Sequence, residues 1–155
     1  MAIEVGDRVP DFTLADEAGN RVKLTNFAGS RLIMFFYPKA MTPGCTTEAC
    51  DFRDNYDAFI KAGFAIVGVS PDPPESNARF KEKEGLSFPL LSDEDHTVAD
   101  QLGSWGIKKN YGKEYEGLIR STFVVGPDGH LEVAYRNVRA KGHVARLVRE
   151  LLETS

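Results

Sequence analysis

One segment of the chain reads Leu32-Ile33-Met34-Phe35-Phe36-Tyr37-Pro38, an unbroken apolar run stopped by a proline. A second apolar run extends from Phe64 to Val69. Such runs are typical of strands buried on both faces of a parallel sheet. Between the two runs, apolar side chains recur at helical spacing, and Gly63 ends the pattern; they are Ala49, Phe52, Tyr56, Phe59 and Ile60. The segment therefore predicts a strand, a helix and a parallel strand.

The rest of the chain extends this pattern on both sides. Downstream we expect a helix over 74–84 closed by Gly85, a short strand over 88–91 and a short helix over 97–102. Two strand-like runs, 121–125 and 131–135, flank the turn residues 126–129 and predict an antiparallel hairpin. A closing helix presents an apolar stripe made of Val144, Leu147, Val148, Leu151 and Leu152.

Residues 12–14 and 21–24 predict a small additional hairpin near the N-terminus. The expected fold class is α/β. The order βαβ, a helical insertion and then ββα matches a thioredoxin-like fold with an added N-terminal β-hairpin.

Length and charge favour one globular domain over residues 1–155. The 155 residues include 19 Lys and Arg against 23 Asp and Glu, which gives a formal net charge of −4. The chain lacks the concentrated basic face that nucleic acid or an anionic membrane requires, so neither is an expected partner. It also has no signal-like N-terminus and no apolar stretch of membrane-spanning length, which predicts a cytoplasmic protein.

The two cysteines are the main candidates for chemistry. A chain of this size needs no disulfide to fold, and two cysteines cannot complete a four-ligand zinc site, so no metal is expected. Thr42 is a good N-cap and Pro43 suits the first helical position, which places Cys45 in the first turn of a helix. Unpaired N–H groups and the helix dipole would stabilise a thiolate there. The alternative is a small, buried, unreactive Cys45.

Cys50 follows Cys45 by five residues, and this spacing has a structural consequence. On a regular helix, five residues correspond to about 140° of rotation and about 7.5 Å of rise, which separates the Cα atoms by roughly 8–9 Å. A disulfide needs a Cα separation below about 7 Å. If Cys45 and Cys50 bond to each other, the first turns of the helix must unwind. Alternatively, Cys50 is an inert core cysteine.

The motif Pro38-x-x-x-Thr42-x-x-Cys45 and the segment Ile119-Arg120-Ser121-Thr122-Phe123 resemble the peroxiredoxins. The resemblance is to the bacterioferritin comigratory protein or Q-type subfamily, and it covers nearly the whole chain. It implies a thiol-dependent peroxidase that reduces hydrogen peroxide and organic hydroperoxides. It also implies roles for individual residues: a peroxidatic Cys45, a resolving Cys50 that forms a disulfide with it, an active-site Arg120, a shielding Pro38 and a Thr42 that binds peroxide.

The chemistry of peroxide reduction explains why these residue types are needed. A thiolate at Cys45 attacks one peroxide oxygen while negative charge develops on the departing oxygen. The Thr42 hydroxyl, the N–H groups of Gly44 and Cys45 and the Arg120 guanidinium can stabilise that charge. Glu48 could orient Arg120 through a bidentate pair, or could be an ordinary solvated carboxylate.

The resemblance further implies recycling by thioredoxin or a similar dithiol, no cofactor, and a monomer. Two other functions remain possible: a dithiol-disulfide exchanger, whose cysteines are normally separated by two residues, and a structural domain with inert thiols. The three histidines, His96, His130 and His143, are expected at the surface or at helix caps.

Overall fold

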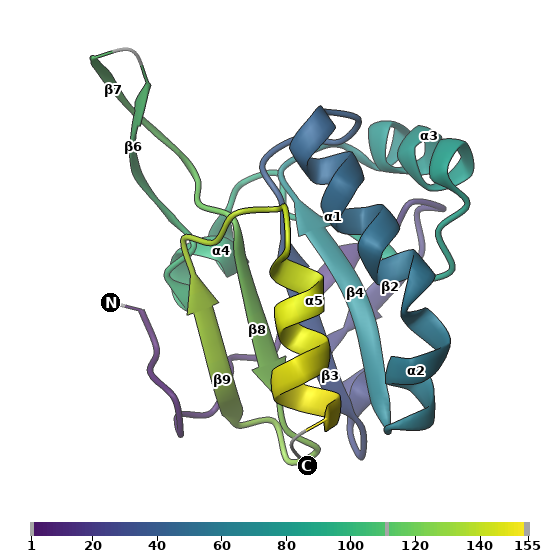
Figure 1. The fold of residues 1–155 in the computed structure, drawn as a ribbon. Helices are drawn as coiled ribbons and strands as arrows, with labels where there is room; N and C mark the ends of the chain where they lie inside the picture. Colours follow the sequence, from purple (N-terminus) through teal and green to yellow (C-terminus); the bar gives the residue numbers. More distant parts are fainter. Residues whose placement is uncertain (1, 111, 154–155) are drawn as a thin grey trace.

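A mixed seven-stranded sheet forms the centre of the computed structural model, which describes residues 2–110 and 112–153. The order of the strands across the sheet is β2-β1-β5-β4-β3-β8-β9 (Figure 1). Their bounds are β1 (Thr13–Ala15), β2 (Arg21–Lys23), β3 (Arg31–Phe36), β4 (Phe64–Ser70), β5 (Leu90–Ser92), β8 (Ser121–Val125) and β9 (Leu131–Arg136). Strands β3, β4 and β5 are parallel, whereas β8 pairs antiparallel with β3.

Helices cover both faces of this sheet. They are α1 (Pro43–Asp54), α2 (Tyr56–Lys61), α3 (Pro74–Glu84), α4 (Thr97–Leu102) and α5 (His143–Leu147), with a 3-10 turn over Leu24–Phe27. Helix α5 continues as a π-helical segment, Val148–Glu153. Helices α1, α2 and α5 lie in front of the sheet in Figure 1, and α4 lies behind it. None of the helices described is long and apolar enough to cross a membrane.

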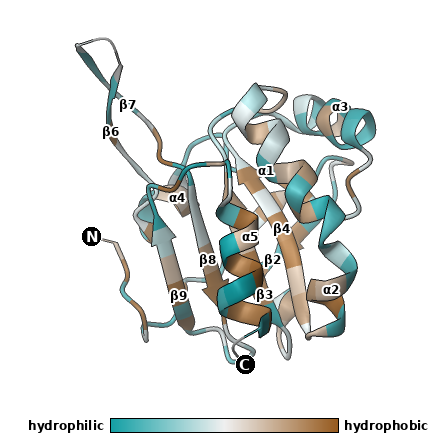
Figure 2. Cartoon of the chain, viewed as in Figure 1, coloured by the Kyte–Doolittle hydropathy of each residue, from teal (hydrophilic) through white to brown (hydrophobic). Residues whose placement is uncertain are grey.

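The alternation of side chains along β3 divides the core into two layers. Phe35 points toward α1 and α2, where it stacks on Phe52 at a centroid distance of 4.5 Å. Phe36 points to the α4 side and packs edge-on against Phe123 of β8. In Figure 2 the hydrophobic colour concentrates on these central strands. The predicted thioredoxin-like order, with its N-terminal hairpin β1–β2, is confirmed.

The prediction of a single helix between the first two parallel strands is wrong in one respect. In the structure this segment is divided at Asn55 into two helices, α1 and α2. Asn55 has φ −107° and ψ 7°, and its side-chain amide donates to the carbonyl of Asp51 at 2.8 Å. Asparagine often forms such local hydrogen bonds in place of a regular helix. Ile60 is also 42% exposed, so it lies outside the core. The short strand expected over 88–91 lies at Leu90–Ser92.

A second hairpin, β6 (Trp105–Asn110) and β7 (Lys113–Leu118), projects from the body of the molecule (Figure 1). It was not predicted. It is mostly hydrophilic in Figure 2, and Ile107 and Tyr115 are exposed on it. Because it packs little against the core, its sequence lacks the apolar pattern by which the other strands were found.

Candidate active site

The register of the central strands brings Cys45 and Arg120 together across 75 residues of sequence. Phe36, at the end of β3, pairs with Ser121, at the start of β8. Arg120 directly precedes that strand, and α1 begins a few residues after β3. Pro43 occupies the first turn of α1 with Thr42 at the N-cap position, as the sequence predicts, so Cys45 lies in the first turn.

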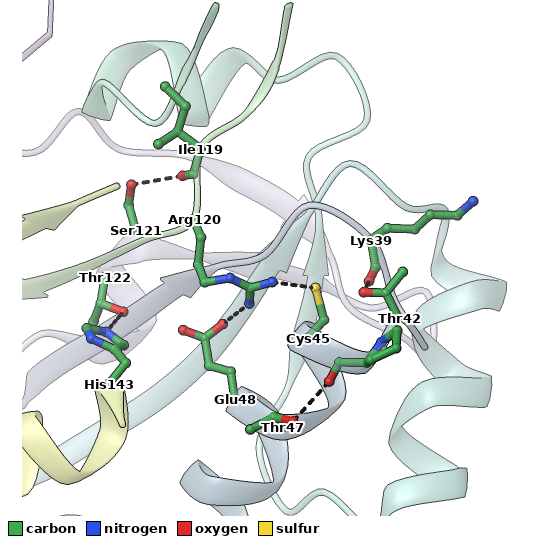
Figure 3. Close-up of polar contacts among 11 residues, drawn as sticks. Lys39, Thr42, Cys45, Thr47, Glu48, Ile119, Arg120, Ser121, Thr122 and His143 are labelled. Carbon is green, nitrogen blue, oxygen red and sulfur yellow. Dashed lines mark hydrogen bonds and ion pairs between the residues drawn. The ribbon is translucent and has the colours of Figure 1, made fainter. Parts of the chain in front are cut away.

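The guanidinium of Arg120 contacts both the thiol and a carboxylate (Figure 3). Its Nη2 donates to Cys45 Sγ at 3.2 Å, and its Nη1 donates to Glu48 Oε1 at 2.7 Å. The Cys45 side chain is fully buried, and that of Arg120 is 14% exposed. Burial lowers the pKa of Arg120. The opposite effect of Glu48 and Cys45 is larger, so the pKa of the guanidinium is raised. A fixed positive charge therefore lies against the sulfur.

Glu48 is buried on α1, one turn beyond Cys45. Burial raises the pKa of its carboxyl to about 7, even though Arg120 acts in the opposite direction. Within the described part of the chain, its Oε2 has no hydrogen-bond partner. Of the two possibilities raised by the sequence, the structure has the Arg120 ion pair rather than a solvated carboxylate. The pair is not bidentate as expected, because only Oε1 of Glu48 accepts from Arg120, while the other guanidinium nitrogen contacts Cys45.

The loop before α1 holds Thr42 beside the site. The Thr42 hydroxyl donates to the carbonyl of Lys39 at 2.9 Å instead of capping the helix. Ala40 N–H donates to Asp72 at 2.8 Å, which fastens the loop to the segment after β4. Met41 adopts a left-handed conformation, with φ 65°. Such a conformation costs energy for a residue with a side chain, and conformations of this kind cluster at functional sites.

Pro38 and Arg120 line a cavity of about 430 Å³. The other lining residues are Ile107, Lys108, Lys109, Ile119, Asn137 and Val138. Burial, followed by Arg120, lowers the pKa of Lys108. Lys108 and Lys109 of this cavity could not be identified from the sequence, because the β6–β7 hairpin that carries them was not predicted. Among residues 2–110 and 112–153, no group of three His, Cys, Asp or Glu side chains is arranged to hold a metal ion.

Cys50 lies further along α1 and is half-buried. Both cysteines are free thiols in one helix, so the helical separation between them persists. The Cys50 thiol donates to Glu84 Oε1 of α3 at 3.5 Å. Burial raises the pKa of this thiol.

The prediction that all three histidines lie at the surface or at caps is wrong for His143. This residue is 4% exposed, and its Nε2 lies 2.8 Å from the Thr122 hydroxyl (Figure 3). Burial lowers the pKa of its imidazole to about 4, so it is neutral at physiological pH. As the first residue of α5, it packs against Thr122 of β8, a long-range contact that the sequence pattern does not reveal.

The model of the AhpC/TSA family matches residues 5–134. The chain belongs to this family. It is 46% identical over 155 residues to peroxiredoxin Bcp of Bacillus subtilis, covering 100% of this chain and 99% of the relative. It is 48% identical over 141 residues to peroxiredoxin Bcp of Escherichia coli, covering 91% and 90% of the two chains. A putative peroxiredoxin of Mycobacterium tuberculosis is 55% identical over 146 residues, covering 94% of this chain and 93% of the relative.

Solved structures agree with this assignment. A serine variant of peroxiredoxin Q from Xanthomonas campestris superposes with a TM-score of 0.87 at 38% identity, covering 93% of this chain and 92% of the other. The bacterioferritin comigratory protein of the same organism, studied for alkyl peroxide reduction, gives a TM-score of 0.84 at 39% identity, covering 88% and 87%. The present chain is thus a peroxiredoxin, and it is an oxidoreductase that reduces peroxides with a thiol.

Gly44 packs against the guanidinium of this peroxiredoxin. A Cβ at this position would lie 3.1 Å from Arg120 Nη2, closer than ordinary contact. We therefore expect Gly44→Ala to displace Arg120 and to slow the reaction of peroxide with the thiol about tenfold, which corresponds to about 1.4 kcal/mol. The same change should leave the free energy of unfolding unchanged or raise it by about 0.5–1 kcal/mol, because alanine suits a helix better. Stopped-flow kinetics and urea unfolding test both expectations, and an unchanged rate would contradict the first.

The raised pKa of Glu48 predicts a pH dependence of stability. The carboxyl titrates near 4.5 when unfolded and at about 7 when folded. The favourable contribution of Glu48 to the free energy of unfolding is therefore complete below about pH 4.5. It is lost as the pH rises through 7, and the total loss is about 3 kcal/mol. His143 acts in the opposite sense, because its lowered pKa costs stability as the pH falls from 6.5 toward 4.

The comparison of wild type with Glu48→Gln isolates the carboxyl, since His143 is present in both. Relative to the variant, wild type should lose stability as the pH rises from about 4.5 to about 7.5. Urea unfolding across this range measures the difference. A constant difference between the two proteins would mean that the folded carboxyl titrates at its ordinary pKa.

Proposed function

We propose that Cys45 is the peroxidatic cysteine of this peroxiredoxin and that Arg120 activates it. The observation that carries the proposal is the 3.2 Å contact between Arg120 Nη2 and Cys45 Sγ. An adjacent cation stabilises a thiolate relative to a thiol, and only the thiolate is a strong nucleophile. Glu48 holds the other arm of the guanidinium and acts as a positioning residue.

The substrate class in this proposal is hydrogen peroxide together with organic hydroperoxides. Alkyl peroxide reduction by the similar Xanthomonas campestris protein supports the second group. The substrate enters, in this proposal, through the cavity that Pro38 shares with Arg120, whose guanidinium contacts the buried sulfur. In this proposal Pro38 has the shielding role that the family resemblance implies, which limits access of water to the thiolate.

The first step is an in-line displacement on oxygen. An electron pair of the Cys45 thiolate forms an S–O bond, the O–O bond breaks, and the departing oxygen leaves as hydroxide or alkoxide. The first hydrogen bond within α1 runs from Thr46 N–H to the Thr42 carbonyl, which leaves the N–H groups of Gly44 and Cys45 free of that ladder. Together with Arg120 they stabilise the developing charge. Thr42 joins them when its hydroxyl turns from the Lys39 carbonyl to the peroxide.

The second step resolves the sulfenic acid on Cys45 with the thiol of Cys50. Because both residues lie in one helix, the turns around residues 43–51 unwind before an intramolecular disulfide can form. Thioredoxin or a similar dithiol then reduces the disulfide. Residues 1–155 act in this cycle as one domain and as a cytoplasmic monomer, in keeping with a compartment that maintains dithiol reductants.

Cys50→Ser tests whether Cys45 reacts with peroxide and Cys50 resolves the product. With one equivalent of hydrogen peroxide, we expect this variant to gain one oxygen at Cys45, to form no intramolecular disulfide and to lose turnover with a dithiol reductant. Intact mass and trapping with a sulfenic-acid reagent measure these changes. If the variant still formed an intramolecular disulfide or turned over at the wild-type rate, the resolving role of Cys50 would be refuted.

A further inference from the structure

The Cys50 thiol faces a carboxylate from another helix. Its Sγ lies 3.5 Å from Oε1 of Glu84, the last residue of α3, and donates a hydrogen bond to it. The contact joins segments 34 residues apart in sequence. A carboxylate is an acceptor for the thiol proton and is repelled by a thiolate, so this arrangement matters at the moment when Cys50 ionises.

Cys50 has to lose its proton to resolve a sulfenic acid, because the thiolate is the nucleophile in disulfide formation. Its surroundings oppose that loss. Burial is the largest cause of its raised pKa, and Glu84 and Asp54 add to it, while only Arg53 acts in the other direction. A half-buried thiol in this setting needs a group that removes the proton as the sulfur attacks.

We propose that Glu84 is the general base of the resolving step. The inference rests on the proposed roles of Cys45 and Cys50 and deepens them. As the Cys50 sulfur attacks the sulfur of the Cys45 sulfenic acid, its proton passes to Glu84. The S–S bond forms with the electron pair of Cys50, and the S–O bond breaks with its pair leaving on hydroxide.

The step is balanced in atoms and electrons. The Cys50 sulfur is oxidised and the Cys45 sulfur is reduced, and no other oxidant is needed. Hydroxide takes up a proton from solvent and leaves as water, while Glu84 returns the thiol proton to solvent. The net change is one sulfenic acid and one thiol converted into one disulfide and one water.

The far end of α1 is fastened to the same residue of α3, which keeps the base near the thiol while the helix opens. Arg53 Nη1 donates to the carbonyl of Glu84 at 2.6 Å. Phe52 and Tyr56 both pack against Phe88 just beyond α3, at centroid distances of 6.5 and 6.2 Å. Cys45 lies in the first turn of α1, at the opposite end of the helix from these contacts, so in this inference unwinding begins there and brings Cys45 toward Cys50.

The test compares Glu84→Gln with Glu82→Gln. Both remove one carboxylate from the same helix, but Glu82 is exposed and has no role in the site. Reduced protein is mixed with one equivalent of hydrogen peroxide, and sulfenic acid formation and disulfide formation are followed as separate phases at several pH values. The first phase should be equal in all three proteins, which also shows that each variant retains an intact Cys45 site.

Two roles of Glu84 predict opposite results in the second phase: a general base, and a negative charge that only disfavours the thiolate. If Glu84 is the base, Glu84→Gln resolves at least about tenfold more slowly near pH 6, and its rate then rises about tenfold per pH unit while wild type changes little. Glu82→Gln behaves as wild type. If Glu84 only raises the pKa of the thiol or holds the helix closed, its removal leaves the second phase unchanged or faster, and the inference is wrong.

The design separates this inference from the proposed function. If wild type itself formed no Cys45–Cys50 disulfide, the proposed resolving mechanism would fail. If wild type formed it while Glu84→Gln resolved just as quickly, only the role of Glu84 would fail.

Discussion

Cys45→Ser is expected to abolish peroxide reduction, with a loss of at least about 10⁴-fold in the rate constant for peroxide. A serine hydroxyl is nearly isosteric with the thiol and can still accept from Arg120. It does not ionise near neutral pH, however, and it cannot form a sulfenic acid. Peroxide consumption in the presence of a dithiol reductant measures the loss.

The matched control for this variant is Cys50→Ser, which removes the other thiol from the same helix. It should react with the first equivalent of peroxide at the wild-type rate, because Cys45 and Arg120 remain in contact. Substantial peroxidase turnover in Cys45→Ser would assign the attacking sulfur to Cys50 and overturn the proposed roles.

Arg120→Met is expected to slow the reaction of peroxide with Cys45 about 10²- to 10³-fold, or roughly 2.7–4 kcal/mol. Methionine keeps the apolar stem of the side chain but removes the charge that contacts Cys45 Sγ and Glu48 Oε1. The pKa of Glu48 should rise further, because Arg120 is the group that lowers it. Stopped-flow kinetics with hydrogen peroxide measure the rate constant.

Two further variants show whether charge or geometry matters at Arg120. Arg21→Met, on the exposed edge strand β2, removes the same charge far from the site and should have no effect. Arg120→Lys retains a cation but loses the fork that reaches sulfur and carboxylate together, so it should recover only part of the rate. A wild-type rate in Arg120→Met would remove this residue from the mechanism.

The local elements of the fold were predictable because each has its own sequence signal. Helix α3 begins at Pro74 and is capped by Gly85 with φ 64°, as punctuation by proline and glycine predicts. The β3 strand follows from its apolar run. The break at Asn55 could not be found in this way, because the apolar spacing of α1 and α2 continues across it. In the structure, the Asn55 side chain donates to the Asp51 carbonyl at the break.

In the candidate site, too, local features were predictable and long-range contacts were not. The position of Cys45 in the first turn of α1 follows from Thr42 and Pro43, which act within a few residues. The contact of Arg120 with that turn depends on the β3–β8 register, which no local pattern contains, and only the family resemblance indicated it. The Glu84 contact with Cys50 and the burial of His143 are long-range packing results of the same kind, and neither was predicted.

The most direct test of the central claim is the reaction of the reduced wild-type protein with about one equivalent of hydrogen peroxide. Free thiols and intact mass are followed on a stopped-flow timescale. Attack by Cys45 and resolution by Cys50 within one chain predict the rapid loss of both thiols and a mass lower by two hydrogens. If neither thiol reacted faster than free cysteine, the proposed roles of Cys45, Arg120 and Cys50 would be contradicted.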